Sequence, residues 1–369
     1  MIRAASALLV SVMAMGCGNE PPAAAPADVP ARTVEVTSSM SGDSDSSECA
    51  FGSIERAILL PDGNVLVLDI ASSSVRIFTR EGDLADVIGS PGPGPGEFGH
   101  PSDITVLDDG TIAVSDAMKA GIIFFSPDGD YTGIMEGFPM TPIRDMHPSG
   151  EGGITGWRSS LEAREGQYFT SLQVCLWKGS SQPETVYWEN LAPTDMSSFS
   201  SMLKQSLYSV RVAADSSGAV FVAPLSTEEY RILCYGPDGE LLNTISMDLS
   251  PAERSEAEME AERLHMESRM RRMGDHGMPM VWEPDPFRTM TGEMGVDSLG
   301  SLWVRRGTSP RPLFDVFDPV SGSRLYTVSV DTELDASGWT FSVGPEGVLA
   351  WEADAESCQS IHFLGFADP

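Results

Sequence analysis

A unit that recurs at an offset of 47 residues constrains this chain more than any other feature of its sequence. The first unit covers residues 54–88 and the second covers residues 104–135. In both units, short runs of β-branched and aromatic residues are separated by turns that end in glycine, and Gly63 aligns with Gly110. Glycine supplies the positive φ that tight hairpins need, so each unit predicts four short antiparallel strands.

A four-stranded unit with a period of ~40 to 50 residues is the pattern of a β-propeller blade. Four further units can be traced by their turns, and they begin near Ile143, Val210, Met294 and Trp339. The sixth unit is one strand short, whereas residues 32–37 form an alternating strand without a hairpin partner. We therefore predict an all-β, six-bladed β-propeller with four-stranded antiparallel blades. The N-terminal strand is expected to close the last blade, because closure removes open sheet edges.

The loop between the first two units carries a resemblance to a known family. Residues 89–103 are rich in Gly and Pro and contain Gly96-Glu97-Phe98. Such a loop, ahead of a strand–Asp-Gly–strand–Asp unit, resembles the interblade segment of NHL repeats, and the match is specific over residues 54–135. The resemblance implies a six-bladed NHL-repeat propeller of the exported bacterial lipoprotein type.

The N-terminus predicts export and lipid anchoring. Arg3 precedes an apolar stretch, residues 4–15, that ends at Gly16-Cys17. A positive start, a short apolar region and a small residue before the cut are typical of a secretory signal, and the stretch is too short to span a bilayer. Gly16-Cys17 resembles the end of a bacterial lipobox, although two upstream positions depart from its pattern. We predict a lipoprotein-type signal peptide over residues 1–17 with Cys17 as the lipidated anchor; an ordinary cleaved signal is the alternative.

The residues after the signal complete this domain organisation. Residues 18–31 are rich in Pro and Ala and predict a tether, and residues 32–369 predict the propeller. Gly18 resembles the outer-membrane sorting pattern of Gram-negative bacteria. We expect a protein anchored in the bacterial cell envelope, at the outer membrane, on its periplasmic or its surface face.

The charge balance limits the partners of the chain. Its 23 Lys and Arg residues face 54 Asp and Glu residues, which gives a formal net charge of −31. Nucleic acid is disfavoured, because phosphates would be repelled and the sequence has no compensating basic stripe. A strongly acidic surface keeps a protein soluble and separate from its copies, so we expect a monomer.

One segment, about residues 250–290, breaks the blade pattern. Ser250-Pro251 fits an N-cap followed by a first helical residue, and residues 255–273 are rich in helix formers. We predict a helical insertion between blades four and five, with a methionine face turned inward. Its sulfur and imidazole groups could also bind Cu(I). These groups are His265, Met266, Met270, Met273, His276, Met278 and Met280. Packing is favoured over a copper site, because no single loop fixes three of them at ligand spacing.

Six residues at the ends of second strands are candidates for ligand binding. They are Asp69, Asp116, Trp157, Arg158, Arg305 and Arg306. The two aspartates are expected chiefly to accept hydrogen bonds from turn amides, with ligand contact as the alternative. The Trp and Arg residues of blades three and five could hold an anionic or carbohydrate ligand. Burial of the Trp side chains between blades is the favoured interpretation.

The sequence contains no recognisable catalytic motif. Its five His residues show neither a Ser-His-Asp nor an HExxH-type arrangement. We therefore predict a binding or scaffolding module of the cell envelope, with no catalytic residues and no cofactor, whose ligand is an unknown protein, peptide or carbohydrate. The alternative is a lactonase-like hydrolase or lyase that depends on Ca²⁺ or another divalent metal. That function would need metal-binding His, Glu or Asn around the central tunnel.

The cysteine count predicts one disulfide. If Cys17 carries lipid, four of the five Cys residues remain in an oxidising compartment, and they allow three pairings. Cys49 lies just before the first strand of blade one, and Cys358 lies between the second and third strands of blade six. These connections emerge on the same face of neighbouring blades, so we predict a Cys49–Cys358 disulfide. Cys175 and Cys234, in third strands of adjacent blades, are expected to be separate buried thiols.

Overall fold

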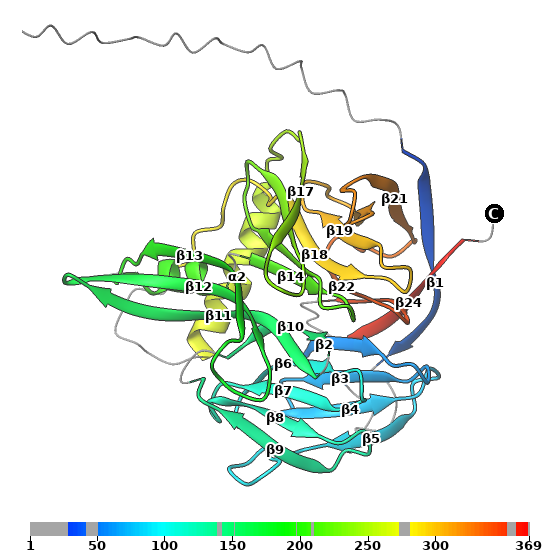
Figure 1. Cartoon of the computed structure of the whole chain (residues 1–369). Helices are drawn as coiled ribbons and strands as arrows, with labels where there is room; N and C mark the ends of the chain where they lie inside the picture. The colour runs from blue at the N-terminus through cyan, green and yellow to red at the C-terminus, as the bar shows by residue number, and fades with distance from the viewer. Residues whose placement is uncertain are drawn as a thin grey trace, which may run out of the picture.

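The structure, a computed structural model, describes residues 29–41, 51–138, 142–150, 152–196, 198–207, 210–272, 281–352 and 359–367. Four separate antiparallel sheets each contain four strands that follow one another along the chain (Figure 1). Blade one contains β2 (Ile54–Leu59), β3 (Val65–Asp69), β4 (Ser74–Phe78) and β5 (Leu84–Ile88), and blade two contains β6 (Pro101–Val106), β7 (Ile112–Asp116), β8 (Gly121–Phe125) and β9 (Tyr131–Glu136). Blade three contains β10 (Arg144–Ser149), β11 (Gly153–Arg164), β12 (Gln167–Trp177) and β13 (Thr185–Pro193), and blade four contains β14 (Val210–Ala214), β15 (Val220–Pro224), β16 (Tyr230–Tyr235) and β17 (Leu241–Met247).

The last two blades are joined into one eight-stranded sheet. Blade five contains β18 (Thr291–Val296), β19 (Leu302–Arg306), β20 (Leu313–Phe317) and β21 (Arg324–Asp331), and blade six contains β22 (Trp339–Gly344), β23 (Gly347–Glu352), β24 (Ser360–Phe366) and the N-terminal strand β1 (Ala31–Ser41). The first strands of the six blades, β2, β6, β10, β14, β18 and β22, contact one another in a closed circle. The fold is therefore the predicted ring of six four-stranded blades.

The N-terminal strand closes the ring on both of its sides. β1 runs antiparallel to β24, from the pair Val34–Phe366 to the pair Ser41–Ser360. Its first half, Ala31–Glu35, also runs parallel to β21 of blade five. The antiparallel pairing confirms the predicted closure of blade six. The parallel pairing was not predicted, and it protects the outer edge of blade five as well.

The second strands of blades one and two are buried along their whole length. All five residues of β3 are buried, and so are all five residues of β7, because a second strand lies between neighbouring blades on both faces. The outer strands are more polar and more exposed, as in β5. The turns between first and second strands end in a glycine with positive φ, 87° at Gly63 and 83° at Gly110. These turns fix the strand register that the sequence pattern predicted.

The apolar core is divided among the interfaces between blades. Leu66 and Leu68 of blade one share a cluster with Ile112 and Val114 of blade two. Blades four and five share another cluster, which includes Phe221 and Val304. Each blade therefore depends on its neighbours for stability, as in other repeat architectures.

Two helices lie outside the blades. α1 (Phe199–Leu207) lies between blades three and four and was not predicted, whereas α2 (Glu256–Arg272) is the predicted insertion. Met266 and Met270 of α2 are buried in one cluster with Leu203 of α1 and Trp282. The inward methionine face is thus an apolar contact between helices. Among the described residues, no helix is long and apolar enough to cross a membrane.

The start of α2 differs from the expectation. The Ser255 hydroxyl accepts a hydrogen bond from the Glu258 amide, and the Glu258 carboxylate accepts hydrogen bonds from the Ser255 amide and hydroxyl. This capping box starts the helix at Glu256, so Ser250 is not the N-cap. Residues 252–254 instead lie beside residues 286–288 through backbone hydrogen bonds. The remaining residues of the copper hypothesis, from Met273 to Met280, lie outside the described part of the chain.

Candidate functional site

Irregular first strands gather charged side chains around the centre of the ring. The pairing register shifts near the beginning of four of them, which are β2, β6, β10 and β18. A bulge turns side chains away from regular alternation and is frequent beside functional sites. Seven charged or titratable residues of β2, β6, β10 and β14 lie at this end and form what we call the inner-strand cluster: Glu55, Arg56, Asp103, Arg144, Asp145, His147 and Arg211.

Ion pairs connect this cluster across three blades. Arg56 of blade one lies 3.2 Å from Asp103 of blade two and 3.6 Å from Asp145 of blade three. Arg144 Nη1 lies 3.9 Å from Glu55 Oε1. One guanidinium group thus faces two carboxylates from different blades, and opposite charges alternate along the cluster.

Asp145 is the most constrained member of the inner-strand cluster. Its backbone has a φ of 52°, in the left-handed region that non-glycine residues seldom occupy. Its Oδ2 accepts a 2.7 Å hydrogen bond from the Val212 amide of blade four. Burial opposes ionisation of the carboxyl, but the nearby His147 imidazole and the Arg56 and Arg211 guanidinium groups outweigh it and lower the pKa of Asp145 to about 2.

Two donors of the cluster have no hydrogen-bond acceptor. His147 Nε2 and Arg211 Nε are both buried and unpartnered. His147 Nε2 lies 3.5 Å from Asp145 Oδ1, which is too long for a good hydrogen bond. Unpartnered buried donors are costly, so an acceptor oxygen from a ligand would be favoured here. The side chains of Asp145 and His147 are 22% and 13% exposed, so solvent reaches parts of both side chains, whereas the two donor atoms themselves are buried.

The cluster does not fit a divalent metal ion. Ca²⁺ prefers about six to eight oxygen ligands, whereas the carboxylates of Asp103 and Asp145 face the guanidinium of Arg56. Over the part of the chain that the structure describes, no three His, Cys, Asp or Glu side chains are grouped closely enough to hold a metal. The metal-dependent alternative therefore has no ligand set among these residues.

Asp69 and Asp116 are buried at the ends of β3 and β7, where they organise turns. The Asp69 carboxylate accepts hydrogen bonds from the amides of Gly52, Ser53, Ala71 and Ser72, and the Asp116 carboxylate accepts them from the amides of Gly99, His100, Met118 and Lys119. Each carboxylate thus joins the loop that enters its blade to the turn after its second strand. Neither belongs to the inner-strand cluster.

Trp157 and Arg158 have separate surroundings. Trp157 is buried in the interface between blades three and four, beside Val210 and Val212. The Arg158 guanidinium hydrogen-bonds Gln173 Oε1 at 3.1 Å and lies 6.0 Å from the centre of the Trp177 ring. The Trp157 ring is therefore not available for stacking on a ligand.

Arg305 and Arg306 are held by ion pairs within blade five. Arg305 Nη1 lies 3.2 Å from Glu293 and donates a 2.7 Å hydrogen bond to the Trp339 carbonyl of blade six. Arg306 forms a two-point pair with the fully buried Asp315, which raises the pKa of the arginine. The structure does not bring the two Trp-Arg candidates of blades three and five together into one site.

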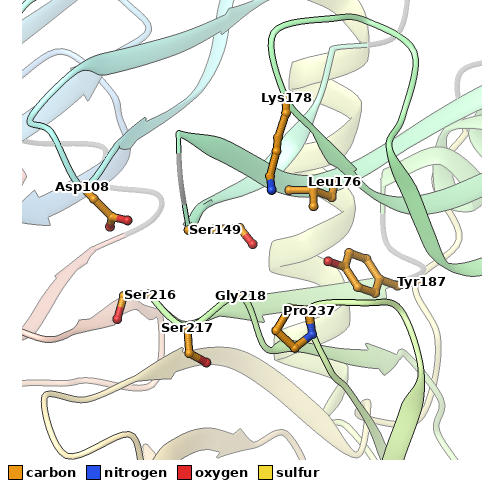
Figure 2. A pocket seen from close by; sticks show the side chains of 10 residues that line it. Asp108, Ser149, Leu176, Lys178, Tyr187, Ser216, Ser217, Gly218 and Pro237 are labelled. Carbon is orange, nitrogen blue, oxygen red and sulfur yellow. The ribbon is translucent and has the colours of Figure 1, made fainter.

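A separate pocket lies at the other end of the strands, between blades two, three and four (Figure 2). It has a volume of about 380 Å³, and its polar lining includes Asp108, Ser149, Lys178, Tyr187 and Ser217. The Tyr187 hydroxyl is buried without a hydrogen-bond partner. Burial, together with the charges of nearby carboxylates, raises its pKa to about 12, so it remains a hydrogen-bond donor at neutral pH.

The cysteine predictions divide into two groups. Cys175 and Cys234 are buried free thiols, and burial raises their pKa to about 12 and about 11, respectively. Raised pKa values make both thiols poor nucleophiles. Cys17, Cys49 and Cys358 lie outside the described residues.

The inner-strand cluster was not predicted from the sequence. One signal was present, because Arg56 and Asp103 occupy the same position in consecutive repeats and carry opposite charges. Such a charge reversal between equivalent positions of adjacent blades favours an ion pair. His147, which was not singled out from the sequence, lies within β10.

Comparisons with known proteins agree with this architecture. A family model described as "6-bladed beta-propeller" matches residues 45–154. In the comparison with curated proteins, no sequence matches. The chain is an all-β propeller.

Solved structures resemble this chain at low sequence identity. A protein from Bacteroides fragilis, provisionally described as exported, is 11% identical, with a TM-score of 0.50 over 92% of this chain and 99% of that one. A calcium-binding protein, regucalcin, from Agrobacterium tumefaciens is 12% identical, with a TM-score of 0.47 over 90% and 95% of the two chains. A streptogramin B lyase is 10% identical, with a TM-score of 0.46 over 89% and 98%. The likeness to the Bacteroides fragilis protein indicates the fold and not the function.

Proposed function

We propose that this protein is an exported, lipid-anchored binding propeller of the NHL type, and that its inner-strand cluster binds an anionic group of its ligand. The observation that carries this proposal is the pair of unpartnered donors, His147 Nε2 and Arg211 Nε, in the cluster at the centre of the ring. An anionic oxygen placed between them would accept both hydrogen bonds. Charge-assisted hydrogen bonds of this kind are stronger than neutral ones.

The charge distribution supports an anionic ligand. The chain as a whole carries a formal charge of −31, yet three arginines and one histidine meet in the inner-strand cluster. Arg56 and Arg144 form ion pairs with carboxylates of the cluster. Arg211, by contrast, has a buried Nε without a hydrogen-bond acceptor. The three arginines are matched by the carboxylates of Glu55, Asp103 and Asp145, so the cluster is locally neutral in a strongly acidic protein, and an anion is repelled less there than elsewhere on the surface.

The strained backbone of Asp145 also supports a role in binding. Left-handed conformations of non-glycine residues cost about 1 kcal/mol or more and are concentrated at functional sites. Here the conformation directs the Asp145 carboxylate toward Arg56, His147 and the Val212 amide at once. The carboxylate thereby fixes the positions of the donors that would bind the ligand.

The proposed location follows from the N-terminal sequence. Cys17 would carry the lipid, and residues 18–31 would separate the membrane from the ring. The tether would enter the propeller directly at β1, the strand that pairs with both blade five and blade six. The ring would thus be attached to the membrane through the strand that closes it.

A matched pair of sugars tests the anion preference. Glucuronate and glucose differ by a carboxylate, so their effects on the melting temperature can be compared at constant ionic strength. We expect glucuronate, and not glucose, to stabilise the purified protein, by about 1.4 kcal/mol at a concentration ten times Kd. Arg211→Gln should remove this effect. Arg164→Gln, which alters only an exposed ion pair with Glu162, should keep it. Equal responses of wild type and Arg211→Gln would overturn the proposal.

A further inference from the structure

Three side chains on adjacent strands of blade six form a continuous hydrogen-bonded row. The Ser39 hydroxyl of β1 lies 2.8 Å from His362 Nδ1 of β24. His362 Nε2 lies 3.1 Å from Glu352 Oε1 of β23. Ser39 and His362 face each other directly in the strand register, although they are 323 residues apart in the sequence. A nucleophile, a base and a carboxylate that orients the base are the components of serine acyl-transfer sites.

The surrounding residues hold the imidazole and the carboxylate in place. The Trp339 ring stacks on the His362 ring, with 4.3 Å between the ring centres and 17° between the planes. The second oxygen of Glu352 accepts a 2.9 Å hydrogen bond from the Ser360 amide. His362 itself is only 3% exposed. Both groups are therefore fixed before any substrate arrives, as a catalytic base requires.

The partners of His362 determine where its proton lies. A carboxylate can only accept hydrogen bonds, so Nε2 carries the proton and donates a hydrogen bond to Glu352. Nδ1 is then the acceptor, and the Ser39 hydroxyl donates to it. The two ring nitrogens have exchanged the tasks they perform in the common serine–histidine–aspartate arrangement. Ser39 is solvent-exposed, so a substrate can reach its hydroxyl while the base stays buried.

We propose that Ser39, His362 and Glu352 form an acyl-transfer site that hydrolyses small carboxylic esters. Ser39 Oγ bonds to the ester carbonyl carbon while its proton moves to His362 Nδ1. The bond from carbon to the leaving alcohol then breaks, and the alcohol oxygen takes that proton. Water repeats the sequence on the acyl-serine, which releases the carboxylic acid and restores the Ser39 hydroxyl. Glu352 stabilises the imidazolium in both halves of the reaction.

The backbone of β1 near Ser39 can stabilise the tetrahedral intermediate, whose oxygen carries a negative charge. β1 pairs with β21 only as far as Glu35, so this parallel ladder ends four residues before Ser39. Backbone N–H groups along the remaining edge of β1 can donate to the oxyanion. The site lies apart from the inner-strand cluster, and this activity does not depend on the proposed binding function.

A fluorophosphonate probe, which reacts covalently with activated serines, tests the site on the purified protein. We expect labelling of the wild type and a burst of p-nitrophenolate from p-nitrophenyl acetate. Ser39→Ala should abolish both. His362→Gln should slow labelling by at least about 100-fold, and Glu352→Gln by at least about 10-fold. Ser38→Ala is the matched control, because it removes a neighbouring hydroxyl that is buried without a partner, and it should label like the wild type.

A thiol in place of the serine separates a catalytic role from a structural one. Ser39→Cys should react faster with iodoacetamide than the double variant Ser39→Cys/His362→Gln, by at least about 10-fold at pH 7, because only the first thiol has a base beside it. Circular dichroism would establish that each variant is folded. The proposal is overturned if wild type and Ser39→Ala are labelled equally by the fluorophosphonate, or if neither is labelled. It is also overturned if His362→Gln changes neither the rate of labelling nor the reactivity of the Ser39→Cys thiol.

Discussion

Asp145 carries two unfavourable features, a left-handed backbone and a largely buried carboxylate. Both are compensated by neighbours from other blades, because Arg56 comes from blade one and the Val212 amide from blade four. The contacts of Asp145 therefore contribute both to the stability of the ring and to the positions of the side chains in the inner-strand cluster. Its contribution should depend on pH, since its pKa lies below the ordinary value for aspartate.

We predict that Asp145→Asn makes stability less sensitive to acid. The folded-state pKa of about 2 lies below the ordinary value of 3.8, so the ionised carboxylate stabilises the fold at neutral pH. That contribution is lost as the pH falls from about 5 toward 2, and it amounts to about 2 kcal/mol. Urea unfolding of wild type and variant at pH 7, 5, 4 and 3 measures it. Parallel pH dependences for the two proteins would show that the carboxylate is not stabilised in the folded state.

Part of the candidate site was available in the sequence. The repeat offset places Arg56 and Asp103 at equivalent positions, and their opposite charges indicate a pair. The contacts of Asp145 with Arg56 and with the Val212 amide could not be predicted, because they depend on a bulge and a left-handed residue. The hydrogen-bonded row from Ser39 through His362 to Glu352 could not be predicted either, because it joins strands from the two ends of the chain.

At the scale of elements, the strands were predictable and the helices only in part. Glycine turns delimit most strands of blades one and two closely, although β6 begins at Pro101, three residues before the predicted start of the second unit at residue 104. α1 was missed because its nine residues are too short for a distinct periodic pattern. The start of α2 was misplaced because Ser250-Pro251 and Ser255 both resemble N-caps. Ser255 forms the cap, since Glu258 completes the reciprocal hydrogen bonds.

We predict that the propeller folds without the insertion. α2 packs mainly on α1 and Trp282, and the strands of blades four and five are complete without it. A variant that lacks residues 252–289, joined by a short Gly/Ser linker, should keep a β-type far-UV spectrum and a cooperative melt. The matched point variant Ser255→Ala should cost only about 1 kcal/mol through loss of the cap. Global unfolding of the deletion variant would mean that the insertion is part of the core.

The whole ring depends on contacts between residues far apart in the chain. β1 joins blades five and six, and the Ile54 amide of blade one donates a 2.7 Å hydrogen bond to Gln359 Oε1 of blade six. The segments that follow Cys49 and Cys358 therefore meet at the junction where the ring closes. This contact supports the proposed disulfide between the two cysteines.

We predict that non-reducing peptide mapping of the exported protein will find Cys49 linked to Cys358. Closing a loop of roughly 300 residues would stabilise the ring by about 5 kcal/mol in the chain-entropy model. Cys49→Ser should therefore lower the melting temperature about as much as Cys358→Ser does, and the double variant should add little. Cys49 found as a free thiol, or paired with Cys175 or Cys234, would refute this closure.

We predict that Cys17→Ser releases the protein from the membrane fraction or blocks its processing. Bacterial lipoproteins carry several acyl chains, which hold a protein far more firmly than one myristoyl chain does. Cell fractionation and the mass of the N-terminal peptide measure the effect. A Cys17→Ser variant that stays on the membrane would contradict lipid anchoring and leave the ring to be held there by other contacts.

Native mass spectrometry of the protein, extracted from its own cell envelope in mild detergent, shows whether the inner-strand cluster binds an anionic ligand. We predict a bound species of defined mass on wild type and on Arg164→Gln, released by acid and absent from Arg211→Gln. A wild-type spectrum that contains only the protein and its lipid, or a bound species that persists unchanged in Arg211→Gln, would contradict such binding.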